Sequence, residues 1–290
     1  MPRRVIVWVG ILSLIAVCSA RAQPPGVAYC VLLDHYDQPV WSSYAGHVDR
    51  SRGDGFKSLG QWELGAHTGL FYAHTAFGEW DLRGGIDSIF FTGKGQHRLP
   101  DHLAAVRLDV DGTWRLAGDN ALRLGFAPGF YSEIHKARSD HLFYPFRVHG
   151  IRAFTGDLSG LLGMDFYPGF DRWYNPRLGV RWMISDFLML DAFYPKTEMV
   201  FRPAMAWTTR IGMEFEEVWE YRLKSRDDRK GLRMKGTRIY AGVEYEMINQ
   251  VAWILQIGRM VDRSMQFRRN YPTLEINDAY FIRFGLGGML

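Results

Sequence analysis

The feature that most constrains the fold of this chain is a regular alternation of apolar and polar side chains. In residues 104–116, apolar side chains from Ala104 to Leu116 take nearly every second position, and charged ones such as Arg107 and Asp109 lie between them. Successive side chains of a β-strand point to opposite faces, whereas an α-helix repeats about every 3.6 residues. The chain is therefore predicted to consist of strands with one apolar and one charged face.

The same alternation continues to the end of the chain. Further predicted strands cover residues 61–71, 79–91, 122–126, 148–155, 158–167, 177–184, 187–194, 207–215, 239–247, 251–261 and 277–289. We count about 12 to 14 strands and no convincing helix. After the first 22 residues, no apolar run is long enough to predict a membrane-spanning helix.

The predicted connections alternate between short and long. Short turns rich in Gly, Asp, Asn and Ser are expected at 118–120, 156–157, 185–186 and 249–250, and longer polar loops near 92–101, 134–147, 168–176, 223–235 and 262–276. This layout is typical of a transmembrane β-barrel with periplasmic turns and extracellular loops. An open sheet edge would leave backbone groups unpaired in the bilayer, so the sheet must close on itself.

The predicted fold class is therefore all-β, a closed antiparallel transmembrane β-barrel of 12 or 14 strands. Bacterial single-chain barrels normally have an even number of strands. The count depends on whether a strand lies within 27–50 and whether 198–222 forms one bent strand or a hairpin. A secreted soluble β-sandwich or β-barrel binding protein is the alternative fold, but its inner faces would have to be apolar rather than charged.

The N-terminus has the pattern of a secretory signal peptide. Arg3 and Arg4 precede an apolar run from Val5 to Val17, and small residues end it before Gln23. We therefore divide the chain into a signal peptide (1–22), an N-terminal segment that could include a first strand (23–58) and an outer-membrane β-barrel (59–290).

Cleavage would change both the charge and the cysteine content. It removes three arginines and no acidic residue, so the formal net charge of +4 becomes +1. Nucleic acid is therefore not an expected partner, because such binding needs a clustered positive surface. Cys30 would be the single cysteine left, and its role is left open. Outer-membrane lipids are the expected partners.

The middle of the chain contains the stretches Tyr144-Pro145, Asn175-Pro176-Arg177-Leu178-Gly179-Val180-Arg181-Trp182 and Leu190-Asp191-Ala192-Phe193-Tyr194-Pro195. In these stretches the chain resembles a family of uncharacterised bacterial outer-membrane β-barrel proteins. In that family a Pro-x-Leu-Gly-x-x-Trp strand is followed by a short turn and an apolar strand that ends in proline. The resemblance implies a barrel in the outer membrane with no assigned activity, and it supplies no catalytic residues.

Charged residues of both signs occupy the face that would line the lumen. The predicted network consists of Glu63, Asp81, Arg83, Asp87, Arg107, Asp109, Asp111, Arg115, Arg123, Arg210, Glu214, Arg238, Glu244, Glu246 and Arg283. Unpaired charges in a confined lumen are costly, so opposite signs on neighbouring strands should pair. Such a lumen would either be closed by salt bridges or form a narrow pore for small solutes or ions.

An outer-membrane lipid hydrolase is the one enzymatic alternative. It needs a serine activated by a histidine, and Ser132 and His135 lie close together, with Ser139, Asp140 and His141 in the following loop. Their spacing matches no known hydrolase motif. The pairs Asp109-x-Asp111 and His47-x-Asp49 are too small to predict a metal site. We therefore expect an exported structural or pore-forming barrel with no catalytic residues, metal or cofactor.

Overall fold

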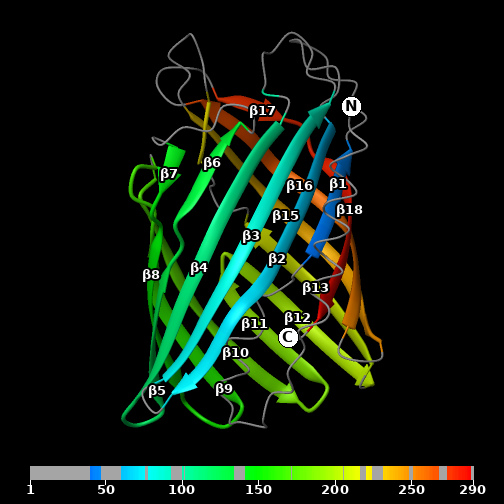
Figure 1. The fold of residues 1–290 in the computed structure, drawn as a ribbon. Helices are drawn as coiled ribbons and strands as arrows, with labels where there is room; N and C mark the ends of the chain where they lie inside the picture. The colour runs from blue at the N-terminus through cyan, green and yellow to red at the C-terminus, as the bar shows by residue number, and fades with distance from the viewer. Residues whose placement is uncertain are drawn as a thin grey trace.

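Nearly all of the described chain is β-structure (Figure 1). The computed structural model describes residues 40–46, 60–75, 78–92, 100, 102–133, 141–170, 172–204, 206–215, 220–223, 231–247, 251–267 and 273–288. The predicted signal peptide, Cys30, His47 and Asp49 lie outside these ranges. Within them, no helix is both long and apolar enough to span a membrane.

The strands follow one another along the chain with few interruptions. They are β1 (Val40–Gly46), β2 (Gly60–Thr75), β3 (Gly78–Thr92), β4 (His102–Leu116), β5 (Asn120–Phe126), β6 (Gly129–Glu133), β7 (Leu142–Phe143), β8 (Phe146–Ala153), β9 (Leu158–Phe166), β10 (Tyr174–Ser185), β11 (Leu188–Tyr194), β12 (Lys196–Ala204), β13 (Trp207–Phe215), β14 (Glu220–Arg222), β15 (Gly231–Glu246), β16 (Val251–Phe267), β17 (Leu274–Ile276) and β18 (Ala279–Gly288).

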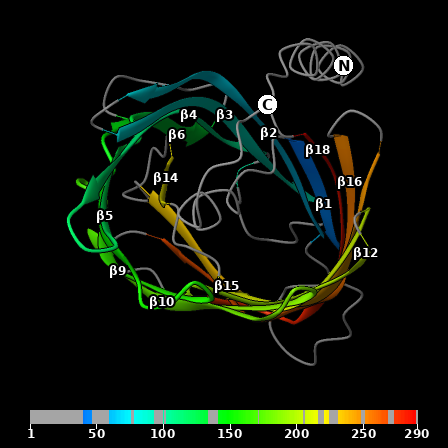
Figure 2. The same cartoon turned by 90° about the horizontal axis from the view of Figure 1, so that it is seen from below.

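The sheet closes into a barrel. Antiparallel pairings run in a cycle β1–β2–β3–β4–β5–β8–β9–β10–β11–β12–β13–β15–β16–β18 and return to β1. Seen along its axis, the barrel is a ring around an interior (Figure 2). Strand β1 makes the closure, because it pairs with β18 on one side and with β2 on the other.

In two places a proline divides one line of the wall into two short strands. Strands β5 and β6 both pair with β4, and they are interrupted at Ala127–Pro128. Strands β7 and β8 are interrupted in the same way at Tyr144–Pro145. Proline has no backbone N–H to donate to the ladder. Its carbonyl still accepts, and Pro128 O receives a hydrogen bond from Leu108 N at 3.0 Å, which keeps the wall continuous.

We call the end of the barrel where β3 ends and β4 begins the long-loop end. At this end, strand pairing also forms a second, smaller ring. There β14 lies inside the larger ring (Figure 2). It pairs antiparallel with β15 and, through Arg222 and Ser132, in parallel with β6. Strand β14 thus joins β15 to β6 directly and bypasses β8 to β13. The barrel narrows at this end.

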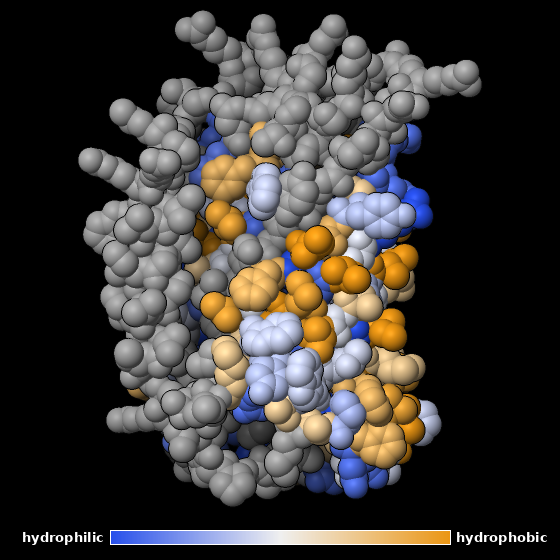
Figure 3. Space-filling model, turned by 90° about the vertical axis from the view of Figure 1, so that its right-hand side faces the viewer, coloured by the Kyte–Doolittle hydropathy of each residue, from blue (hydrophilic) through white to orange (hydrophobic). Residues whose placement is uncertain are grey.

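The two faces of the wall differ as the alternation predicts. In β10, Leu178, Val180 and Trp182 are 62%, 40% and 48% exposed, whereas Arg181 between them is 4% exposed. The apolar side chains gather on the outer surface of the wall (Figure 3). Charged side chains are therefore inside the barrel, and the exposed surface of the strands is apolar.

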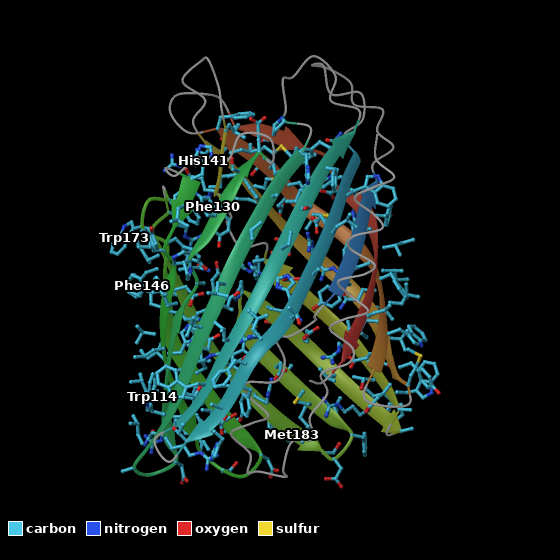
Figure 4. The ribbon with its side chains drawn as sticks, in the orientation of Figure 1. Trp114, Phe130, His141, Phe146, Trp173 and Met183 are labelled. Carbon is cyan, nitrogen blue, oxygen red and sulfur yellow. The ribbon has the colours of Figure 1, made fainter. Side chains whose placement is uncertain are left out.

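Aromatic side chains lie on the outer face near both ends of the strands. Trp80 and Trp114 pack edge to face, with ring centroids 4.9 Å apart, at the end where β4 meets β5, which we call the short-turn end. Figure 4 shows Trp114 near this end, and Phe130 and Trp173 nearer the other. Trp62, 47% exposed, begins β2 at the long-loop end. Aromatic side chains at both ends are typical of membrane barrels.

The predicted short turn at 118–120 has the conformation that its residues favour. Gly118 and Asp119 have φ values of 66° and 55°, and the Asn120 side chain donates to Ala117 O at 2.8 Å. Glycine, Asp and Asn are the residues that adopt positive φ most readily.

The loop predictions near 134–147, 168–176, 223–235 and 262–276 were partly wrong, because strands extend into all four. Strand β7 and the first residues of β8, β10 and β15 lie there, together with the end of β16 and all of β17. In parts of these segments the faces are reversed, because Leu232, Met265 and Phe267 are buried inside and Lys235 and Gln266 are exposed, so the sequence read as a polar loop. Residues 198–222 form a hairpin, β12 and β13, followed by β14, rather than one bent strand.

Closure of the ring at β1 and β18 can be tested by cross-linking. In a chain with Cys18 and Cys30 replaced by Ser, Tyr44→Cys combined with Ile282→Cys should form a disulfide on oxidation, because these positions face each other in the register. The linked chain should migrate differently on a denaturing, non-reducing gel after boiling.

The matched control combines Tyr44→Cys with Leu286→Cys. Leu286 faces Val40, four residues further along β1. That offset is about 13 Å along a strand, beyond the ~7 Å that a disulfide can bridge. Equal cross-linking of both pairs would contradict this register.

Candidate functional site

The interior of the barrel contains a dense network of ion pairs, centred on Asp111 of β4. One carboxylate oxygen of Asp111 lies 3.0 Å from Arg83 of β3, 3.2 Å from Arg123 of β5 and 2.8 Å from Arg147 of β8. Asp111 is 3% exposed. Three cations from three strands therefore share one buried acid.

The network continues toward the long-loop end through Arg107. This guanidinium lies 3.2 Å from Asp87 and 3.4 Å from Asp109, while His67 Nε2 lies 2.9 Å from Asp87. Gly85 provides room for this packing, because a Cβ there would meet His67 Nδ1 at 2.6 Å. Asp87 thus pairs with bases from both neighbouring strands, and Asp109 pairs with a base of its own strand.

A second group of pairs lies on β10 to β15. Arg181 binds Asp191 through two nitrogens, at 2.5 and 2.9 Å, and both residues are buried. Arg210 lies 2.7 Å from Glu244. The buried Glu198 lies 3.0 Å from Lys196 and accepts a hydrogen bond from Tyr240 Oη at 2.6 Å. These charges are satisfied by side chains of the same wall.

A third group of contacts connects β2, near the start of the described chain, with the late strands β15 and β16. Arg238 of β15 lies 2.6 Å from Glu63 of β2, and Arg263 of β16 donates to Gln61 Oε1 at 3.0 Å. Arg283 lies 3.9 Å from Glu214. Glu63 and Arg238 are 175 positions apart, so the pair connects parts of the barrel that are distant in sequence.

Most of the predicted network residues take part in these groups, with two clear exceptions. Arg115 pairs with Glu79 at 3.3 Å but is 48% exposed at the short-turn end, and Glu246 is exposed at the end of β15. Asp81 pairs with Arg83 of its own strand at 2.8 Å.

Several inward-facing charges were not predicted. His149, Asp165, Arg181, Asp191 and Glu198 are buried, and Arg147 and Arg177 are partly buried. His149 Nε2 lies 2.7 Å from Asp165, which also accepts from Arg177 Nε at 2.6 Å. Strands β8 to β11 alternate between apolar and polar side chains as the other strands do. Whether a charged residue falls on an odd or even position of its strand could therefore have predicted that it points inward.

A buried apolar cluster lies near the long-loop end, beside buried charges such as Glu220 and Arg263. The buried cluster there, which we call the upper cluster, consists of Ile89, Phe91, Leu103, Ala105, Tyr131, Phe143, Tyr167, Phe170, Tyr221, Leu232, Met265 and Phe267. Its members come from strands around the narrow ring and from the turn after β9. Leu103, Tyr131 and Leu232 are all 0% exposed, and the rings of Phe143 and Phe170 are 4.4 Å apart. At this level buried apolar side chains from the strands and from the turn after β9 pack together.

Ser132 of the predicted hydrolase group contacts His141. Ser132 Oγ and His141 Nδ1 are 2.6 Å apart, and both side chains are 4% exposed. His135, Ser139 and Asp140 lie outside the described residues. The described part of the chain contains no group of three or more His, Cys, Asp and Glu side chains that could hold a metal ion.

Comparisons with known proteins identify only solved structures. No family model matches the chain, and no curated protein does. The NanC porin matches with a TM-score of 0.40 and 12% identity over 87% of this chain and 98% of its own. LpxR from Salmonella typhimurium matches with a TM-score of 0.33 and 12% identity over 87% of this chain and 100% of its own.

A mutant of the Rh. blastica porin also matches. Its TM-score is 0.32, with 8% identity over 84% of this chain and 98% of the porin. Scores this low transfer neither a site nor a function from these proteins.

The importance of Asp111 can be tested by Asp111→Asn. The substitution keeps the shape of the side chain but removes the charge shared by three arginines. Breaking a buried ion pair from one side typically costs about 3–5 kcal/mol. We expect a loss of this size in the free energy of unfolding, measured by urea titration in lipid vesicles.

Arg115→Gln serves as the matched control, because it breaks a pair whose arginine is 48% exposed. Exposed pairs contribute about 0–1 kcal/mol. If the two variants lost the same stability, the Asp111 network would not be an important support of the barrel.

Proposed function

We propose that this protein spans a bacterial outer membrane as a single closed barrel. The observation that supports this most directly is the exposed apolar surface on the strands. Leu162, Leu178 and Ile211 are 70%, 62% and 62% exposed on β9, β10 and β13. Such a continuous apolar surface is unfavourable in water and favourable against lipid. It therefore argues against the soluble β-sandwich or barrel.

We further propose that the membrane-spanning wall has fourteen strands. These are the members of the pairing cycle, β1 to β5, β8 to β13, β15, β16 and β18. The remaining short strands β6, β7, β14 and β17 extend the wall or narrow it at the long-loop end. The long-loop end is proposed to face outward, and the export signal at 1–22 remains a prediction.

Within the membrane, we infer a structural role for the barrel rather than that of an open pore. The upper cluster supports this inference, because twelve buried apolar and aromatic residues fill the narrow ring. Between the upper cluster and the short-turn end, the inward-pointing acids and bases form ion pairs with one another. An open ion pathway would instead need a continuous polar lining.

The membrane-facing role of the outer surface can be tested by Ile211→Lys. Ile211 lies in the middle of β13 and is 62% exposed. A lysine near the bilayer midplane costs about 2–4 kcal/mol in a barrel. We expect this loss in urea titrations of protein folded in phospholipid vesicles, followed by gel migration without boiling. Ile211→Leu is the control, and an Ile211→Lys variant as stable as Ile211→Leu would argue against lipid contact at this position.

The closed lumen can be tested in planar lipid bilayers. We expect the folded wild-type protein to add no steady ion conductance. Tyr131→Ala combined with Tyr221→Ala should produce channel openings, because both rings lie in the upper cluster and are 0% and 2% exposed. The control Tyr280→Ala, which removes an outer ring that is 75% exposed, should remain silent.

Gel migration without boiling would show that each variant is folded before recording. Steady conductance of the wild-type protein would overturn the structural role and favour the narrow pore.

A further inference from the structure

We propose that Ser132 and His141 form the catalytic pair of an ester hydrolase that acts on membrane lipids. The proposal concerns the outer wall and is independent of whether the lumen is closed. It rests on the contact between the two side chains, on their position in the wall and on what surrounds them.

The contact has the geometry that nucleophilic catalysis by serine requires. A serine hydroxyl is a weak nucleophile until a base takes its proton, and the base must lie within hydrogen-bond reach of about 2.6–3.2 Å. Ser132 Oγ and His141 Nδ1 are 2.6 Å apart. The Ser132 hydroxyl also lies 3.2 Å from the backbone carbonyl oxygen of Glu133, which cannot act as a base.

Two strands hold the serine in place. Ser132 pairs with Ala104 of β4, and on its other edge with Arg222 of β14. His141 directly precedes β7, which pairs with the first two residues of β6. Ser132 therefore lies in a paired strand, and His141 directly adjoins one. The pairing of β6 with β7 holds the two residues near each other.

The register places Ser132 on the outer side of the barrel. Tyr131, its neighbour, belongs to the upper cluster inside the ring. Successive side chains alternate between faces, so Ser132 shares the outer face with Phe130, which is 40% exposed. Figure 4 shows Phe130 and His141 close together at the long-loop end of β6.

The depth of the pair identifies the substrate class. Ser132 is two residues, or about 7 Å of strand, beyond the apolar pair Val106 and Phe130. One pair further along, Phe90 and His102 stack on the same outer face, with ring centroids 3.9 Å apart. Aromatic side chains mark the membrane interface in barrels, so Ser132 lies close to the level where the ester groups of lipids meet their hydrocarbon chains. A lipid acyl ester is therefore the substrate we infer.

The chemistry of the reaction balances with water as the second substrate. Ser132 Oγ attacks the ester carbonyl carbon while His141 Nδ1 takes the hydroxyl proton. The carbon–oxygen bond to the lipid alcohol breaks, His141 returns the proton to that alcohol, and the acyl group remains on Ser132. Water, deprotonated by His141, then attacks the acyl carbon. The bond from that carbon to Ser132 Oγ breaks, and His141 returns the proton to Oγ, which releases the fatty acid and restores the serine and the neutral histidine.

The burial of the pair sets a condition on the reaction. Both side chains are 4% exposed, so the lipid ester and the hydrolytic water can reach the hydroxyl only when the side chains that cover it move aside. A purely structural hydrogen bond would share this geometry, and the experiment must therefore distinguish reactivity from stability.

The test uses the full chain, purified in detergent and shown to be folded by gel migration without boiling. The probes are a fluorophosphonate, which labels activated serines, and a fluorogenic medium-chain fatty-acid ester in mixed phospholipid micelles. The wild-type protein should be labelled at Ser132 and should hydrolyse the ester. Ser132→Ala should lose labelling and at least about 100-fold in rate.

A second variant separates the base from the fold. His141→Asn keeps a group that can hydrogen-bond the hydroxyl but cannot take its proton, so it should stay folded and lose a similar factor in rate. Ser185→Ala is the matched control, since Ser185 lies at the short-turn end and its hydroxyl has no hydrogen-bond partner among the described residues. It should keep full activity. A folded wild-type protein without ester hydrolysis, or a Ser132→Ala variant that retains labelling or rate, would overturn the proposal.

Discussion

Closure of the backbone hydrogen-bond ladder is the constraint on which the rest of this structure depends. Backbone groups left unpaired in hydrocarbon cost several kcal/mol each, so a wall that contacts lipid can have no free edge. The seven residues of β1 meet this constraint by pairing with β18 and with β2. Because a closed sheet has no free edge, its outer face can contact lipid without a second sheet to cover it. The polar side chains then lie on the inner face.

The closed wall in turn determines how charge is distributed. An unpaired ion is costly in a confined interior, and each acid described above lies beside a base from its own strand or from another strand of the barrel. Asp111 compensates arginines from β3, β5 and β8 together. Where the ring narrows, Tyr131, Leu103 and Leu232 form a buried apolar cluster beside the remaining charges.

Sequence periodicity predicted the long strands and many inward-pointing charges. In a strand, all odd positions share one face and all even positions the other, so placing one residue places the rest. It could not predict which charges meet, since Glu63 and Arg238 are 175 positions apart and only the closed register joins them. Strand β14, at three residues, is too short to show any period. Near Ser132 the sequence offered both His135 and His141, and the contact with His141 depends on β7 pairing beside β6.

The bypass made by β14 has a consequence for the order of assembly. Ser132 and Arg222, which it brings together, are separated in the chain by the whole of β8 to β13. The pairing is therefore a long-range contact, and such contacts form more slowly than pairings between consecutive strands because more chain entropy is lost. One edge of Ser132 thus depends on a strand that lies far along the chain, while its other edge pairs with β4.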